Sequence, residues 1–143
     1  MRAYETELAV RFEHVDIWGI VYYPRYFEML STVIENWFEE ALGVNYRHFH
    51  EVEGRGIPLV EVHCRFMQPS HLSDRLRFLL RVTRLGRRSI TLNLRAFGDD
   101  GQRLEADMTV VYASRDSGRA ASREIPPELA HKIREFLVTD TAN

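Results

Sequence analysis

The residues whose types and spacing could do chemistry lie close together near the start of the chain. Asp16 is followed by Gly19 and then, eight residues after the aspartate, by Pro24. Proline is favoured in the first turn of a helix, where its missing N–H is not needed. The free N–H groups of that turn can bind a developing oxyanion, and glycine lets the backbone approach a ligand closely. A carboxylate beside such amides is suited to acyl transfer, as a nucleophile or as a general base.

The same spacing has simpler interpretations, which the residues alone leave open. An aspartate before a helix commonly serves as a cap or turn residue. His14, two residues before Asp16, could tune the carboxylate or share its proton, and it could equally be an ordinary hydrogen-bonded loop histidine. The aromatic residues that follow Asp16 fit either an aryl pocket or the core.

Other kinds of reactive site find little support in the sequence. The single cysteine, Cys64, excludes an intramolecular disulfide, and its parity with Val62 and Phe66 favours a small buried hydrophobe over a nucleophile. The histidines lack the spacing of a metal set, so we expect no metal, and no cofactor is implied. Ser31 and Ser89 lack a Gly-x-Ser-x-Gly context, which argues against a serine hydrolase.

Hydrophobic periodicity predicts the elements that position Asp16. Alternation from Tyr4 to Phe12 predicts a strand, and residues 13–23 form an irregular turn. Apolar residues at spacings of three and four predict a helix of about 18 residues from Pro24 to a C-cap at Gly43. Residues 44–57 are expected to form a loop.

The second half of the chain has the character of a sheet. Strands are expected over Leu59–Phe66, Arg75–Leu85, Ser89–Phe97 and Leu104–Ala113, with a hairpin turn at Asp99-Asp100-Gly101. Short connections predict an antiparallel meander, and a short helix should follow Pro126 and Pro127. The long helix must cover one face of this sheet, which gives an α+β fold in a single domain over residues 1–143. Unpaired sheet edges favour dimerisation.

Composition limits the classes of function. The 143 residues are 45% apolar and 28% charged, which is typical of a globular protein and excludes a disordered one. A net charge of −2 argues against a general nucleic-acid binder. No run approaches the roughly 18 apolar residues of a membrane span, and the chain begins without the apolar segment of a signal peptide. We therefore expect a cytoplasmic protein without a membrane partner.

The net charge hides an asymmetry between the two halves of the chain. Residues 1–61 carry eleven acidic and five basic residues, whereas residues 62–143 carry ten acidic and fourteen basic residues. Arg87, Arg88 and Ser89 fall at a strand-to-strand turn, where guanidinium, hydroxyl and backbone N–H groups together could bind phosphate. The alternative is a solvated hairpin tip.

The run Asp16-Ile17-Trp18-Gly19-Ile20-Val21-Tyr22-Tyr23-Pro24 resembles the N-terminal motif of the 4-hydroxybenzoyl-CoA thioesterase family. The order of elements also resembles that family's hotdog fold, in which a curved antiparallel five-stranded sheet wraps one long helix. The resemblance implies that Asp16 is the catalytic carboxylate, that the backbone N–H of Tyr23 polarises the thioester carbonyl, and that Gly19 is the motif glycine.

The resemblance further implies an active site at a dimer interface, in a homodimer or homotetramer. Residues expected to contact substrate are Trp18, Val21 and Tyr22 near the acyl group, and Arg87, Arg88 and Ser89 at the nucleotide end of CoA. The chain departs from the family pattern at His14, where many members have aspartate, and at Trp18, where a small residue is common. These departures leave the acyl group open, aromatic or aliphatic.

The resulting hypothesis is an acyl-CoA thioesterase that releases a free acid and CoA. A thioesterase acting on acyl carrier protein and a non-catalytic acyl-CoA-binding module are the alternatives. The presence of Asp16 favours an enzyme over a binding module. A hotdog dehydratase is disfavoured because its Asp/His motif is absent from the sequence.

Overall fold

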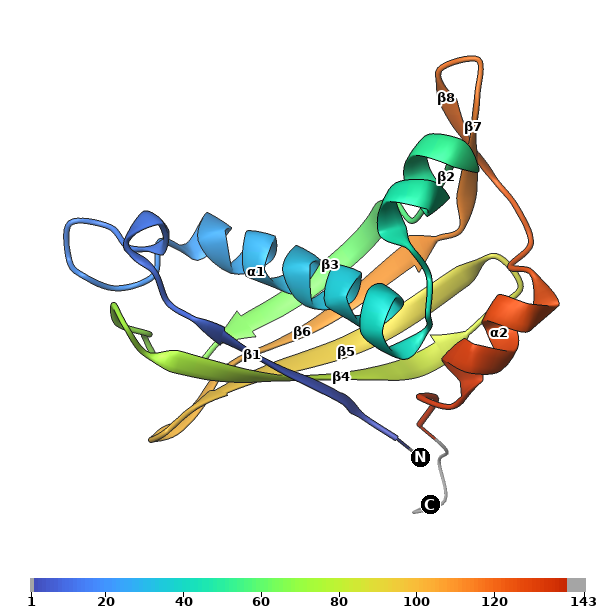
Figure 1. Cartoon of the computed structure of the whole chain (residues 1–143). Coiled ribbons are helices and arrows are strands. Elements are labelled where there is room, and N and C mark those ends of the chain that lie inside the picture. The colour runs from blue at the N-terminus through green and yellow to red at the C-terminus, as the bar shows by residue number, and fades with distance from the viewer. Residues whose placement is uncertain (1, 139–143) are drawn as a thin grey trace.

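The computed structural model describes residues 2–138 and shows one long helix lying across a curved antiparallel sheet (Figure 1). The helix, α1, spans Tyr23–Asn36 and continues into a π-helical turn over Trp37–Ala41. The five strands of the sheet lie in the order β1-β4-β5-β6-β3. Their bounds are β1 Tyr4–Ala9, β3 Leu59–Phe66, β4 Arg75–Leu85, β5 Ser89–Gly98 and β6 Gly101–Val111. The expected α+β class is confirmed.

The prediction of a four-strand meander is wrong for its first strand. β4, β5 and β6 form a meander, but β3 pairs along its whole length with β6. β4 has no free edge for β3, because β1 already occupies the edge that β5 leaves open. The connection over residues 67–74 therefore crosses the end of the sheet to reach β4.

A smaller sheet was not predicted. It consists of β2 Arg55–Gly56, β7 Ala113–Asp116 and β8 Arg119–Ser122, in the order β2-β7-β8. The strand expected over 104–113 ends at Val111, and the chain then turns back at Ser117 and Gly118, both with positive φ. The expected loop over 44–57 contains a π-helical turn at His48–Val52. The first strand is also shorter than expected, because Phe12–His14 form a turn of 3-10 helix.

The core lies between α1 and the sheet, as the helical periodicity predicts. Leu30, Ile34 and Trp37 of the predicted apolar stripe are buried, and they face buried side chains of the central strands. The C-terminal helix α2, Pro127–Arg134, confirms the last predicted element. Its Lys132 donates to the carbonyl of Leu42 at 3.1 Å, which satisfies a carbonyl just after the long helix. No helix within residues 2–138 has the length and apolar character of a membrane span.

Trp37 is the largest fully buried side chain, and its ring packs edge-to-face on Phe38 and Phe136 at centroid distances of 5.5 and 5.7 Å. Trp37→Ala should lower the free energy of unfolding, measured in urea titrations, by about 3–5 kcal/mol. The substitution leaves a cavity in the core into which the surrounding side chains relax only partly. Trp37→Phe should cost less, since it also removes a buried indole N–H that has no partner within residues 2–138. Val52→Ala, at an exposed position, is the control. An equal loss in the control and in Trp37→Ala would contradict this account of the core.

Candidate active site

The segment singled out in the sequence folds into a tight hairpin, here called the motif hairpin (residues 14–22). The carbonyl of His14 accepts from the N–H of Tyr22, and the N–H of Asp16 donates to the carbonyl of Ile20, both at 2.9 Å. Gly19 closes the turn with φ +78° and donates its N–H to the carbonyl of Asp16. A Cβ at Gly19 would meet no atom within 4 Å. The glycine is therefore required by the backbone conformation rather than by lack of space.

Asp16 is half-buried, and its carboxylate takes part in the turn. One oxygen, Oδ1, accepts from the N–H of Trp18 at 2.8 Å. Within residues 2–138 the other oxygen has no hydrogen-bond donor. The cap-or-turn interpretation is therefore correct for one oxygen, and the second oxygen is available to a ligand.

The motif hairpin leads directly into α1. Tyr22 precedes the helix and Tyr23 is its first residue, with Pro24 in the first turn as expected. Tyr22 offers no side-chain cap, and the N–H of Tyr23 has no acceptor within the described residues. Because Tyr22 pairs with His14, two residues before Asp16, the carboxylate and the open helix N-terminus belong to one short structural unit.

His14 is engaged in the preceding turn. Its Nδ1 accepts from the N–H of Arg11 at 2.8 Å, and its Nε2 lies 3.7 Å from a carboxylate oxygen of Glu13. An acceptor Nδ1 places the proton of the neutral ring on Nε2. This is the hydrogen-bonded loop histidine of the two alternatives, and its contacts are with Arg11 and Glu13 rather than with Asp16.

The side chains around the motif hairpin divide into exposed and buried ones. Trp18 is 81% exposed and Tyr23 is 62% exposed, and Tyr22 is half exposed. Val21, by contrast, is 7% exposed and belongs to the core. Trp18 and Tyr22 are therefore free to contact a ligand with their side chains, whereas Val21 presents mainly its backbone.

Arg87 and Arg88 lie in the turn between β4 and β5, and Ser89 is the first residue of β5; the three residues are here called the arginine turn. Arg87 pairs with Glu124 at 3.0 Å, and Arg88 donates to the hydroxyl of Ser122 at 3.1 Å. The arginine turn lies at the end of β4 opposite to the motif hairpin (Figure 1). One chain therefore does not bring Asp16 and these arginines together.

Comparison with known proteins identifies the family. Residues 10–133 match the model of the Thioesterase-like superfamily. The chain belongs to this family. The match confirms the resemblance noted in the sequence and the expectation of a thioester hydrolase. No curated protein matches the sequence.

Solved structures show that this family member has the hotdog fold. The 4-hydroxybenzoyl-CoA thioesterase of Pseudomonas sp. strain CBS-3 is 23% identical, with a TM-score of 0.82 over 92% of this chain and 99% of that one. A 1,4-dihydroxy-2-naphthoyl-CoA thioesterase from Synechocystis is 19% identical, with a TM-score of 0.81 over 94% of this chain and 98% of that one. A gentisyl-coenzyme A thioesterase is 22% identical, with a TM-score of 0.80 over 88% and 98%.

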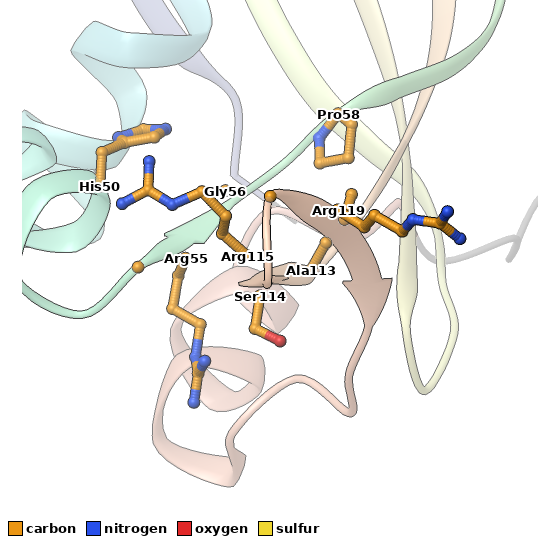
Figure 2. A pocket seen from close by; sticks show the side chains of 11 residues that line it. His50, Arg55, Gly56, Pro58, Ala113, Ser114, Arg115 and Arg119 are labelled. Atoms are coloured by element: carbon orange, nitrogen blue, oxygen red, sulfur yellow. The ribbon is translucent and has the colours of Figure 1, made fainter.

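A hollow that the sequence gave no reason to expect lies beside the small sheet. It has a volume of about 310 Å³ and contains Arg55, Arg115 and Arg119 in its lining. Within residues 2–138 none of the three forms an ion pair with a carboxylate. Figure 2 shows that their guanidinium groups point in three different directions, with that of Arg115 turned toward His50. The three arginines therefore do not converge on one anion.

Among residues 2–138 the remaining reactive groups show no second catalytic arrangement. Cys64 is half-buried, and this burial raises the pKa of its thiol above the ordinary value, which disfavours the nucleophilic thiolate. Within the described part of the chain no group of three or more His, Cys, Asp or Glu residues could hold a metal ion. The motif hairpin and the first turn of α1 are the best candidate for the reacting centre.

Proposed function

We propose that this protein, acting as a single hotdog domain, hydrolyses an acyl-CoA thioester to a free acid and CoA. The observation that carries the proposal is the unit formed by the motif hairpin and α1. Within residues 2–138 it combines an Asp16 carboxylate oxygen without a donor and a Tyr23 N–H without an acceptor, in a chain of a thioesterase family. A general base or nucleophile and an oxyanion donor are the two parts that thioester hydrolysis requires.

The reaction follows from these two groups. The N–H of Tyr23 donates to the carbonyl oxygen as negative charge develops on it. Asp16 either accepts a proton from the attacking water or attacks the carbonyl carbon itself, with water then hydrolysing the anhydride. In both routes the carbon gains an oxygen, the C–S bond breaks, and the sulfur leaves as a thiolate that is protonated to the thiol of CoA. The hydrogen bond from Trp18 N–H keeps the other oxygen of Asp16 fixed.

The substrate is held at two places in this proposal. The exposed side chains of Trp18 and Tyr22 line the acyl end, together with the backbone of Val21. The arginine turn binds the phosphates of CoA, which guanidinium groups match in charge and geometry. Because one chain holds these places at opposite ends, the complete site requires a second copy.

The edge strand β3 is the surface best suited to that second copy. It pairs with β6 on one side only, and Leu59, Val60, Val62 and Phe66 are exposed along it. The other edge strand, β1, is more polar, since Glu5 and Glu7 lie on it and pair with Arg77 and Arg75 of β4. An apolar unpaired edge is a template for strand pairing, so we propose a homodimer across β3, with a homotetramer as the larger assembly.

Two-fold pairing across β3 also completes the site. The Phe66 end of β3 leads to the motif hairpin, and the Leu59 end lies opposite Val110, beside the start of β5 and the arginine turn. Antiparallel pairing of two copies places the Phe66 end of one beside the Leu59 end of the other. The arginine turn of the partner then lies at the same end of the dimer as Asp16.

The proposal that the protein is cytoplasmic rests on the sequence alone.

Purified protein should release CoA from at least one member of a panel of aromatic and aliphatic acyl-CoA esters, measured with a thiol reagent. Asp16→Asn should lower kcat by about 10²-fold or more, because it removes the base or nucleophile. The asparagine oxygen can still accept from Trp18 N–H, so the turn is kept. Asp99→Asn, at an exposed hairpin turn, is the matched control. Turnover that requires the acyl group on a carrier protein, or binding without turnover, would favour the alternatives.

Replacing Arg87 and Arg88 together by alanine should raise KM for a CoA ester by about 10²-fold or more, since each of the two lost charge-assisted phosphate contacts is worth about 1.5–3 kcal/mol. KM for the truncated pantetheine ester, which lacks the nucleotide, should stay unchanged. Arg47→Ala, an exposed arginine paired within its own helical turn, serves as the control. An equal rise in KM for both esters would support the alternative that the arginine turn is a solvated hairpin tip.

Val60→Lys with Val62→Lys should dissociate the protein to monomers of 16.8 kDa, measured by light scattering, because a charged edge strand cannot pair. Activity should fall together with the dimer, since the site needs the partner. Val52→Lys introduces one such charge at an exposed valine outside β3 and should change neither property. A doubly substituted protein that stays dimeric would rule out β3 as the interface.

A further inference from the structure

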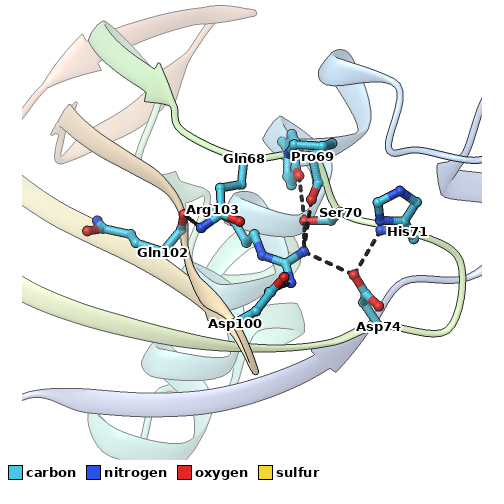
Figure 3. Close-up of polar contacts among 9 residues, drawn as sticks. Gln68, Pro69, Ser70, His71, Asp74, Asp100, Gln102 and Arg103 are labelled. Carbon is cyan, nitrogen blue, oxygen red and sulfur yellow. Dashed lines mark hydrogen bonds and ion pairs between the residues drawn. The ribbon is translucent and has the colours of Figure 1, made fainter.

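A buried arginine contacts the connection that is hydrogen-bonded to the motif hairpin, and the proposed reaction gives this arginine no role. Arg103, on β6, is 4% exposed and lies among polar groups of the connection over residues 67–74 (Figure 3). We infer that Arg103 is a positioning residue, which sets the place of the Asp16 hairpin relative to the N-terminus of α1. The inference rests on the proposed thioesterase function.

Arg103 binds the connection at several points. Its Nη1 donates to the carbonyl of Pro69 at 3.0 Å, to the hydroxyl of Ser70 at 3.1 Å and to a carboxylate oxygen of Asp74 at 3.0 Å. Its Nη2 pairs with Asp100. The N–H of His71 and the guanidinium of Arg103 hold the pKa of Asp74 below its ordinary value. The Arg103 side chain is only 5% exposed, so its buried charge depends on these two carboxylates for compensation.

Ser70 transmits this constraint to the site. It is fully buried, its hydroxyl accepts from the phenol of Tyr26 at 2.7 Å, and its carbonyl accepts from the N–H of Val21 at 2.9 Å. Tyr26 lies on α1, one turn after the Tyr23 N–H, and Val21 lies in the motif hairpin. One residue therefore holds both halves of the proposed site.

Two further contacts fasten the hairpin to the connection. The N–H of Leu72 donates to the carbonyl of Gly19 at 3.3 Å, and Ile20 forms an antiparallel bridge with His71. The exposed tip of the hairpin buries little apolar surface, so these polar contacts fix its position. If residues 67–74 shifted, the motif hairpin would shift with them, and Asp16 would move away from the proposed oxyanion donor, the N–H of Tyr23.

Gly98 shows that the fold makes room for this arrangement. It lies at the end of β5, opposite Gly101 of β6, and the guanidinium of Arg103 passes over it. A Cβ at Gly98 would overlap that guanidinium, with its Cζ 2.5 Å away. Gly98→Ala would therefore push Arg103 out of place while every hydrogen-bonding group remains in the chain.

The expected consequence is a loss of rate without a loss of binding. A misplacement of about 1 Å at a reacting group can lower the rate by about 10²-fold. Arg103 contacts neither the arginine turn nor Trp18 and Tyr22, so the proposed binding contacts should persist. The signature is a fall in kcat at constant KM.

The test compares Arg103→Met, Arg103→Lys and Gly98→Ala with Arg95→Met, which removes an ion pair to Glu105 on the neighbouring strand. We expect kcat to fall about tenfold or more in Arg103→Met and Gly98→Ala, with KM within twofold, and Arg103→Lys to recover part of it. Arg95→Met should keep its kcat. If Arg103→Met does not fold, Arg103→Lys and Gly98→Ala are compared with Arg95→Met instead.

Amide hydrogen exchange gives a readout that is independent of activity. The amides of Val21 and Leu72 should exchange about tenfold faster in Gly98→Ala and Arg103→Met, while those of Val33 in α1 and Leu92 in β5 stay protected. Unchanged kcat and unchanged exchange in folded variants, or a parallel rise in KM, would overturn the inference. A wild-type protein that releases no CoA would refute the proposed function, and the exchange rates would still decide whether Arg103 positions the hairpin.

Discussion

The placement of the motif hairpin depends on one buried polar junction, the set of hydrogen bonds made by Ser70. Apolar burial orients α1 on the sheet, but burial is non-directional and cannot fix a hairpin whose tip faces water. Hydrogen bonds have directions and lengths, and those of Ser70 reach α1, the hairpin and Arg103. The core thus supplies the stability of the fold, and the junction supplies the geometry of the candidate site.

The strand order explains why the junction lies there. Because β3 pairs with β6, the chain must cross the end of the sheet before it enters β4. That crossing, residues 67–74, passes behind the motif hairpin and meets Arg103 at the start of β6. A meander over all four strands would have replaced the crossing by a tight turn and left the hairpin without support. The same pairing leaves β3 as an open apolar edge, so the support of the hairpin and the proposed dimer have one topological origin.

Local features of the fold could be predicted because their signals are local. The period of Leu30, Ile34 and Trp37 located the helix, and alternation located the strands. The pairing of β3 was not predictable in this way, since it depends on which edge remains free after β1 has docked. The Asp16 motif and its turn were visible in the sequence, whereas only the folded structure shows that the Tyr23 N–H has no acceptor among residues 2–138.

The burial of Arg103 could not be predicted from the sequence, for a physical reason. It stands next to Leu104, which is buried on the core face, and alternation therefore assigns its side chain to the outer face with the other arginines of the basic half. The one signal in the sequence is Gly98, just before the hairpin turn, which leaves space beside the strand for the guanidinium, whereas a Cβ at Gly101 would meet Gln68 instead. Nothing local distinguishes glycines that serve a turn from glycines that make room for a guanidinium.

The charge asymmetry of the chain gains a meaning from these positions. The acidic half contains the motif hairpin and α1, and the basic half contains the arginine turn at the far end of the sheet. Within one chain this separation would keep an anionic ligand away from the Asp16 carboxylate. On the proposed two-fold pairing, the basic end of each copy lies beside the motif hairpin of the other. On this proposal the phosphates of CoA are attracted to one subunit while the thioester reaches the carboxylate of its partner, and each site draws on both chains.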